Sequence, residues 1–457
     1  MVFSDSGCRR FSFGTFVPAK VLLQHRANTL RFVPAACRDD VAVELACLLT
    51  RATYGSDATA ISSLLLFPKA VLAALPRRAP RGLHLAELVS ERLRCWRADA
   101  AAHVPTQPRK APPSRRKPAA TVPPEKIISL INEGYLSKAS RAVTPALVLD
   151  GAARGVQQKL AALHPPAGAL PVPPAVAAVA FSEAAVLRAL KGLQRSESAG
   201  PDGFRAQHLL QLVTTLGGSP RPALLTAVTR FVSAAAAGSL PREWAPAFCA
   251  ASLLAFSKKG DGVRPIAVAN FWPKLVSACV LAELANGWDW EGLQWGVGAP
   301  GGADIVIHTA RQAAAALEAN PDGILLKVDV INAFNSVDRA AVTRACSASD
   351  DTLGAWASWS LGSPSLLATG GAPLRSAQGV RQGDPASPLM FSAALQTTAR
   401  AVKAAGDLDD GIIGTTVAAF ASVLSTLQSS LAAVGLRLNA AKSEALCGDT
   451  AASACPA

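Results

Sequence analysis

Residues 324–330 read ILLKVDV and continue as INAFNSVDR up to residue 339. The apolar run predicts a buried strand over residues 324–330 that carries the carboxylate of Asp329 near its end. A strand holds such a side chain rigidly, and burying a carboxylate is costly unless it meets a cation. Asp329 is therefore a candidate cation ligand, although a solvated acid at the end of a strand would look the same.

A second acidic segment lies far downstream, where residues 408–411 read LDDG. Asp409 and Asp410 stand side by side ahead of a glycine that permits a tight turn. Three carboxylates converging from two segments would form an all-oxygen site, which suits Mg²⁺. Two such ions about 4 Å apart would clamp the attacking and leaving oxygens of a phosphoryl transfer. On its own, an acidic pair is usually a solvated turn.

The segment between these two is patterned by glycine and proline. Residues 378–388 read QGVRQGDPASP and lead into a long helix predicted over residues 387–405. The two glycines permit a close approach of the backbone to a ligand, and Ser387 is placed to cap a helix that starts at Pro388. An ordinary loop ahead of a helix is the alternative interpretation.

Together these segments resemble the reverse transcriptase of non-LTR (LINE-type) retrotransposons. Residues 329–339 are similar to that family's first catalytic motif, residues 379–389 to its template-and-nucleotide-positioning motif, and residues 408–411 to its metal-binding hairpin. Four more stretches match in the expected order, namely SAGPDGF (198–204), RPIA (264–267), QWGVGAPGGA (294–303) and GLRLNAAKSEAL (435–446). Seven ordered motifs are far more specific than any one of them.

The resemblance implies a role for each matching residue at the reacting centre. Asp329, Asp409 and Asp410, with the main-chain carbonyl of Val330, would hold two Mg²⁺ ions, which Mn²⁺ could replace. Phe334 would lie beneath the sugar as a steric gate that favours dNTPs. A core phenylalanine on a helix face is the alternative for Phe334.

Two further sets of residues follow from the resemblance. The implied nucleotide-binding residues are Lys258, Arg264, Phe334, Gln382, Gly383 and Lys442. Lys258 and Arg264 would grip the triphosphate, and Lys442 would donate a proton to the leaving pyrophosphate. The implied template-binding residues are Gly200, Pro201, Asp202, Gly203 and Phe204.

The fold implied by the resemblance is α+β, a right-hand polymerase palm and fingers with the thumb largely missing and no endonuclease. The chain stops 15 residues after Lys442, so an incomplete copy of a mobile element is expected. Residues 403–408 (KAAGDL) contain no aromatic strand, and only 27 residues separate Gln382 from Asp409. A strand lost there would leave Asp409 short of Asp329. The alternative function is therefore a catalytically dead, nucleic-acid-binding remnant.

Composition divides the chain into four predicted regions. These are a basic amino-terminal region (1–103), a Pro-rich and basic linker (104–124), a helical connector (125–174), and the fingers and palm (175–457). Helices are predicted over residues 181–195, with Ser182 at the cap, and over residues 305–319. The uncharged stretch 411–436 is long enough to span a bilayer, but its many Ser and Thr residues favour a strand over 411–418 and a helix over 419–433.

The charge of the chain is concentrated in its first quarter. The formal net charge is +13, of which residues 1–120 carry +11 (19 Lys and Arg against 8 Asp and Glu). Such a balance speaks against an acidic-ligand or Ca²⁺-binding protein and favours polyanions. The predicted partners are an RNA template, a DNA primer or target, and dNTPs, with no membrane. Nine cysteines without zinc-ligand spacing indicate reduced thiols, and the predicted location is intracellular and nuclear.

Overall fold

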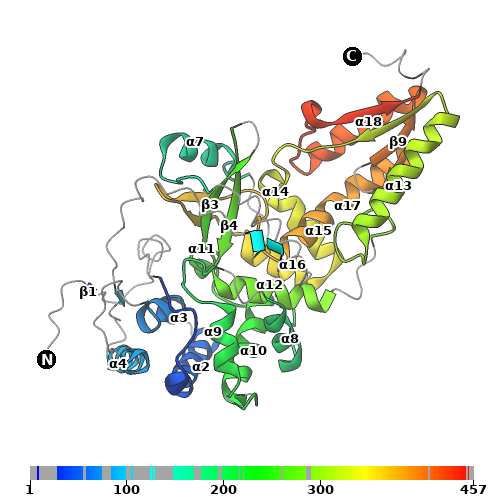
Figure 1. Cartoon of the computed structure of the whole chain (residues 1–457). Helices are drawn as coiled ribbons and strands as arrows, with labels where there is room; N and C mark the ends of the chain where they lie inside the picture. The colour runs from blue at the N-terminus through cyan, green and yellow to red at the C-terminus, as the bar shows by residue number, and fades with distance from the viewer. Residues whose placement is uncertain are drawn as a thin grey trace.

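The computed structural model describes residues 8–9, 28–54, 58–74, 84–98, 104–105, 124–125, 127–128, 148–168, 176–193, 198–215, 217–219, 221–258, 261–284, 290–409, 412–448 and 451. Helices and two four-stranded sheets alternate along these residues, so the α+β prediction is confirmed. The amino-terminal helices lie at one end of the molecule in Figure 1, and the sheet that contains β9 lies at the other end.

The main helices are, in chain order, α2 (Arg38–Tyr54), α3 (Ala58–Val71), α4 (Leu85–Ala98), α7 (Arg154–Ala162), α8 (Glu183–Gly192), α9 (Ala206–Val213), α10 (Pro222–Ala236), α11 (Ala245–Phe248), α12 (Phe271–Leu284), α13 (Gly302–Ala316), α14 (Ala333–Ser336), α15 (Arg339–Ser349), α16 (Asp351–Leu361), α17 (Ser387–Ala405) and α18 (Val417–Ala433). Short 3₁₀ turns are present at Ala35–Cys37, Arg242–Trp244, Leu317–Ala319 and Ala440–Lys442. No helix among the described residues is long and apolar enough to cross a membrane.

The strands are β1 (Cys8–Arg9), β2 (Val104–Pro105), β3 (Ala251–Lys258), β4 (Gly262–Ala269), β5 (Gly323–Lys327), β6 (Ser365–Ala368), β7 (Leu374–Ser376), β8 (Asp407–Asp409), β9 (Ile412–Thr416) and β10 (Glu444–Cys447). β1 and β2 pair with each other. One four-stranded sheet has the order β4-β3-β6-β7, and the other has the order β10-β5-β9-β8.

The second sheet is antiparallel throughout and carries the motifs singled out above. Its central strand β5 shows the alternation of a half-buried sheet, because Ile324 and Leu326 are buried while Lys327 is exposed. Helices α17 and α18 pack against it, and Val423, Leu427 and Leu431 of α18 are buried. One face of this sheet is therefore covered by helices and belongs to the core, and the other face is more exposed.

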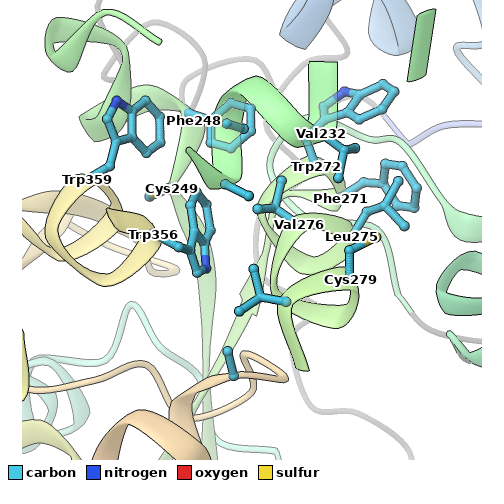
Figure 2. Packing of buried hydrophobic residues seen from close by; sticks show 14 of the residues in the cluster. Val232, Phe248, Cys249, Phe271, Trp272, Leu275, Val276, Cys279, Trp356 and Trp359 are labelled. Atoms are coloured by element: carbon cyan, nitrogen blue, oxygen red, sulfur yellow. The ribbon is translucent and has the colours of Figure 1, made fainter. Parts of the chain in front are cut away.

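The core among helices α11, α12 and α16 is built around aromatic side chains. Trp356 and Trp359 of α16 stack at 5.8 Å between ring centroids. Trp272 of α12 lies nearly parallel to Phe204 at 5.6 Å. Figure 2 shows how the α12 side chains face those of α11 and α16. The indole N–H groups of Trp356 and Trp359 are satisfied internally, since Trp356 donates to Ser277 and Trp359 to the carbonyl of Leu240. Such a core fixes the helices that support the site.

The amino-terminal helices share this core. Helix α2 packs along α10 and touches α9, and its buried leucines belong to the same apolar cluster as the rest of the chain. Arg221 pairs with Asp39 at 2.6 Å, and the N–H of Val33 donates to the side chain of Gln211. The described helices of the basic region therefore belong to the same folded body as α9 and α10.

Several element predictions can be compared directly. Helix α17 has the predicted bounds, and Ser182 caps α8 by accepting a hydrogen bond from Ala185 N–H at 3.1 Å. The uncharged stretch forms strand β9 and helix α18, as predicted. The predicted cap at Ser387 is wrong, because α17 begins at Ser387 itself and the Ser387 hydroxyl accepts from the N–H of Arg381 instead.

Candidate active site

Asp329 lies just past the end of β5, at the edge of the sheet where the β8–β9 hairpin turns. In the register of the sheet, Lys327 pairs with Ile412, and Ile412 pairs with Asp409. The end of β8 and the start of β9 are therefore level with the end of β5, which Asp329 follows by two residues. β8, the first strand of the hairpin, follows α17 directly, with no further strand between them, so the expected loss of a strand at this point stays a prediction.

The other two predicted carboxylates are only partly described. The backbone of Asp409 is placed by its pairing in β8, whereas its side chain and all of Asp410 lie outside the described residues. Among the described residues, no group of three or more His, Cys, Asp or Glu side chains gathers as a metal site. The predicted three-carboxylate centre therefore stays a prediction.

Asp329 is held by the segment that follows α18. Asn439 donates from its side-chain amide to Asp329 Oδ2 at 2.6 Å, and from its main-chain N–H to the Asp329 carbonyl at 2.8 Å. The hydroxyl of Ser443 accepts from Asp329 N–H at 3.1 Å. Lys442 Nζ lies 3.9 Å from Asp329 Oδ2. Sequence reasoning had assigned Lys442 to the pyrophosphate and had missed Asn439 and Ser443.

The donors described here fit a hard divalent cation. The Asp329 side chain is 43% exposed, and the ammonium of Lys442 beside it shows that the position accommodates a positive charge. Val330 forms a bridge with Leu438 that uses the peptide groups of residues 329 and 331. Successive carbonyls of a strand point to opposite sides, so the Val330 carbonyl points away from Leu438. A carboxylate and a main-chain carbonyl are the ligands that Mg²⁺ prefers.

Phe334 lies on the one-turn helix α14, five residues after Asp329. Its ring stacks on Phe391 of α17, with centroids 4.8 Å apart and planes 13° apart. Its carbonyl accepts from the N–H of Val380 at 2.7 Å. Phe334 is half-buried, so it is neither a fully buried core residue nor a free surface ring. Phe391 was not predicted, because nothing in its own neighbourhood distinguishes it from a core residue of α17.

Gln382 and Gly383 lie against β4, between the two sheets. The carbonyl of Gln382 accepts from Ala267 N–H at 3.1 Å. Gly383 has φ +117°, and a Cβ there would lie 2.6 Å from the Ala267 carbonyl oxygen, so only glycine fits. Arg264 is exposed on β4, and Lys258 is exposed at the end of β3. The contacts of Gln382 and Gly383 with Ala267 therefore hold this loop against the β3–β4 hairpin.

Buried charges behind the loop hold it in place, and sequence reasoning missed them. The guanidinium of Arg339 is 2% exposed and donates to the carbonyls of Gly379 (2.9 Å), Leu361 (3.0 Å) and Ser376 (3.1 Å). Burial, followed by the neighbouring Arg381, lowers the pKa of Arg339 to about 9. At neutral pH the group therefore remains a cation, and hydrogen bonds to charged donors are the stronger ones.

Asp384 follows the same loop and is also buried. Burial raises the pKa of its carboxyl, and Arg381 opposes that rise. Its Oδ1 accepts from the N–H of Ala386 at 2.9 Å, which fixes the start of α17. The RQGDP sequence is thus a charged loop whose side chains turn inward while Gln382 and Gly383 face β4.

The segment predicted to bind template is mostly buried. Asp202 is inaccessible and accepts from the N–H groups of Phe204 (3.2 Å) and Phe271 (2.9 Å). Burial raises its pKa to about 6 in spite of these bonds and of Lys69 and Lys274. Pro201, Gly203 and Phe204 are buried as well, and Gly200 is half-buried. These side chains hold the loop together, and their part in template binding stays a prediction.

A cavity of about 440 Å³ lies beside this segment. Residues of the amino-terminal region, of the segment 198–205 and of strand β3 line it. Lys69 and Arg205 are its charged lining residues; Lys69 is buried near the carboxyl of Asp202, and Arg205 is half-buried. The cavity therefore offers positive charge where an acidic polymer could approach.

Comparisons with known proteins agree with these observations. Residues 256–453 match the family model described as reverse transcriptase (RNA-dependent DNA polymerase). The retrotransposable element SLACS 132 kDa protein of Trypanosoma brucei gambiense is 27% identical over 280 residues, which cover 56% of this chain and 22% of that protein. The chain thus spans about a fifth of the length of this relative.

Among solved structures, apo telomerase from Candida tropicalis, truncated from its C-terminal domain, is 14% identical over 44% of this chain and 50% of that one, with a TM-score of 0.27. The matched family residues begin near the end of β3 and include Asp329 and all the other strands of the two four-stranded sheets. Residues 256–453 are therefore similar to a reverse transcriptase domain, and the chain as a whole is similar to a retrotransposable-element protein over 56% of its length.

Proposed function

We propose that the chain is an RNA-directed DNA polymerase that adds dNTPs to a primer 3′-hydroxyl. The observation that carries the proposal is the meeting of Asp329 with the β8–β9 hairpin at one edge of the second sheet. Extension of a DNA primer annealed to an RNA template, with dNTPs and Mg²⁺, tests it directly. RNA binding without any incorporation would instead support the nucleic-acid-binding remnant.

Asp329, Asp409 and Asp410, with the Val330 carbonyl, would hold two Mg²⁺ ions. When bound, the ions would activate the 3′-hydroxyl and neutralise charge on the leaving pyrophosphate. The protein's own part is orientation: Asn439 and Ser443 fix Asp329, and Arg339 fixes the loop that faces β4.

Cations around the centre would serve the triphosphate. Arg264 and Lys258 extend from the β3–β4 hairpin, which also contacts the Gln382–Gly383 segment. Lys442 is 57% exposed beside Asp329 and is the nearest described ammonium to the reacting position. Its role as proton donor to pyrophosphate is a proposal supported by that proximity.

Replacing Phe334 by valine should relax sugar selection. The stacked ring of Phe334 is held at a fixed angle by Phe391, so it can exclude a 2′-hydroxyl by shape. We expect ribonucleotide use, relative to dNTP use, to rise about 10- to 100-fold, the scale on which a pocket discriminates a small group. Single-nucleotide incorporation with dNTP and rNTP series measures it.

A second variant in the same experiment changes Phe391, the ring on which Phe334 stacks. Phe391→Leu removes the stack but keeps an apolar side chain, and we expect a smaller change in the same direction. Phe420→Val on α18 is the matched control, because Phe420 is half-buried away from α14. Unchanged selectivity in Phe334→Val would contradict the gate and leave Phe334 as a packing residue.

Replacing Arg205 by alanine should weaken RNA binding. Arg205 lines the cavity beside residues 198–203, and burial, followed by Arg31, lowers its pKa. If it contacts one phosphate, the affinity should fall and the salt dependence of log K should decrease by about 1. Fluorescence anisotropy of labelled single-stranded RNA at several salt concentrations measures both. Arg188→Ala, an exposed arginine on α8, is the control.

The partners and location are proposed on the same basis. An RNA template, a DNA primer or target and dNTPs are the substrates of the proposed reaction. The +11 charge of residues 1–120 would add a salt-sensitive, sequence-independent contribution to nucleic-acid binding. The proposed location is nuclear, in a ribonucleoprotein with the element's RNA.

A further inference from the structure

Asn439 makes a hydrogen bond to the side chain of Asp329, whereas the neighbouring hydrogen bonds reach only the main chain of Asp329. Two of the bonds in this segment join main-chain atoms of Asp329, its carbonyl to Asn439 N–H and its N–H to Ser443 Oγ. These fix the path of the backbone. The third, from the Asn439 amide to Asp329 Oδ2 at 2.6 Å, fixes the carboxylate itself.

The amide bond leaves one oxygen of the carboxylate for other use. Oδ2 receives the amide and faces Lys442 at 3.9 Å, so Oδ1 is the oxygen to which no described group is bonded. Ligating carboxylates are themselves oriented by hydrogen bonds of this kind. An amide is a neutral donor, and it therefore orients the carboxylate without cancelling the charge that attracts a cation.

We propose that Asn439 is a positioning residue of the polymerase centre, which orients the Asp329 carboxylate for a divalent cation by binding its Oδ2. The inference rests on the proposed function, because it takes Asp329 as a metal ligand. Asn439 itself touches neither nucleotide nor primer; it acts through Asp329. Its removal should therefore weaken metal binding in a protein that is still folded.

Binding of Mn²⁺ alone to the full chain, without nucleotide, is the test. Free Mn²⁺ is followed by electron paramagnetic resonance, and Asp329→Ala defines the binding that does not involve Asp329. Asn439→Leu keeps the volume of the side chain and removes the donor. Asn320→Leu is the matched control, because it makes the same substitution at an exposed asparagine shortly before β5.

We expect Asn439→Leu to lower the Asp329-dependent Mn²⁺ affinity about 10-fold, the usual scale for a residue that orients a ligand, and Asn320→Leu to change it less than about twofold. The Mg²⁺ concentration for half-maximal primer extension should rise by the same factor. Asn439→Ala, which adds no bulk, is used should the leucine variant fail to fold.

Two results would overturn the inference, and they can be told apart. Wild-type affinity in Asn439→Leu, with binding still lost in Asp329→Ala, rejects the role of Asn439 and leaves the proposed metal centre standing. Equal binding by the wild type and Asp329→Ala rejects the metal assignment and the inference together.

Discussion

Asp329→Asn is expected to abolish nucleotide incorporation while the protein stays folded. Asparagine has the size of aspartate, and its Oδ1 can still accept from the Asn439 amide, so the cradle around residue 329 persists. What is lost is a charged ligand whose interactions with the ions stabilise the transition state. A loss of about 4 kcal/mol corresponds to a ~10³-fold lower rate, and a decrease of that size or larger is expected in primer extension.

Asp322→Asn is the matched control for this experiment. Asp322 is an exposed acid immediately before β5, so the change in net charge is the same and the carboxylate at the end of the strand is untouched. RNA affinity, measured in parallel, should be equal in all three proteins. An Asp329→Asn protein that kept a tenth or more of the wild-type rate would contradict the assignment of Asp329 as a catalytic residue.

Arg339→Met is expected to give the largest loss of stability. The substitution retains an apolar stem of similar length and removes a guanidinium that serves four main-chain carbonyls and the Ser376 hydroxyl. Losing the buried charge is itself favourable, but each buried acceptor left without a donor costs about 1–3 kcal/mol. The balance predicts a decrease of about 3 kcal/mol in the free energy of unfolding.

Urea denaturation followed by tryptophan fluorescence measures this decrease. Trp356 and Trp359 are buried on α16, and α16 packs against α15, the helix that carries Arg339. Arg344→Met, an exposed arginine on the same helix α15, should change stability by less than about 0.5 kcal/mol. Equal stabilities for the two variants would show that the carbonyls find other donors.

The sequence predicted elements whose signals are local. The bounds of α17 and the cap of α8 at Ser182 follow from hydrophobic spacing and one hydroxyl. The cap at Ser387 was mispredicted because two side chains compete at that turn: Asp384 takes the N–H of Ala386, and the Ser387 hydroxyl takes that of Arg381. The residue types alone do not tell which of the two side chains, Asp384 or Ser387, will accept from a given main-chain N–H of the turn.

The site was predictable in its motifs but not in its supports. Asp329 stands out because an acid interrupts an apolar strand, whereas Asn439 looks like any polar residue in a loop until the fold brings it to Asp329. Arg339 has the same difficulty, since an arginine at the start of a helix is usually solvated and its acceptors are carbonyls of other segments. Such residues gain their meaning from contacts between distant parts of the chain.

The shared core of the amino-terminal helices also has a consequence for how the chain is made. The Asp39–Arg221 pair joins residues 182 apart in sequence, and α2 packs along α10. At about 5–20 residues per second of synthesis, α2 waits roughly 10–40 s on the ribosome before its partner helix emerges. During that interval its buried leucines have no α10 to cover them, so we expect the nascent chain to depend on holding chaperones over that stretch of translation.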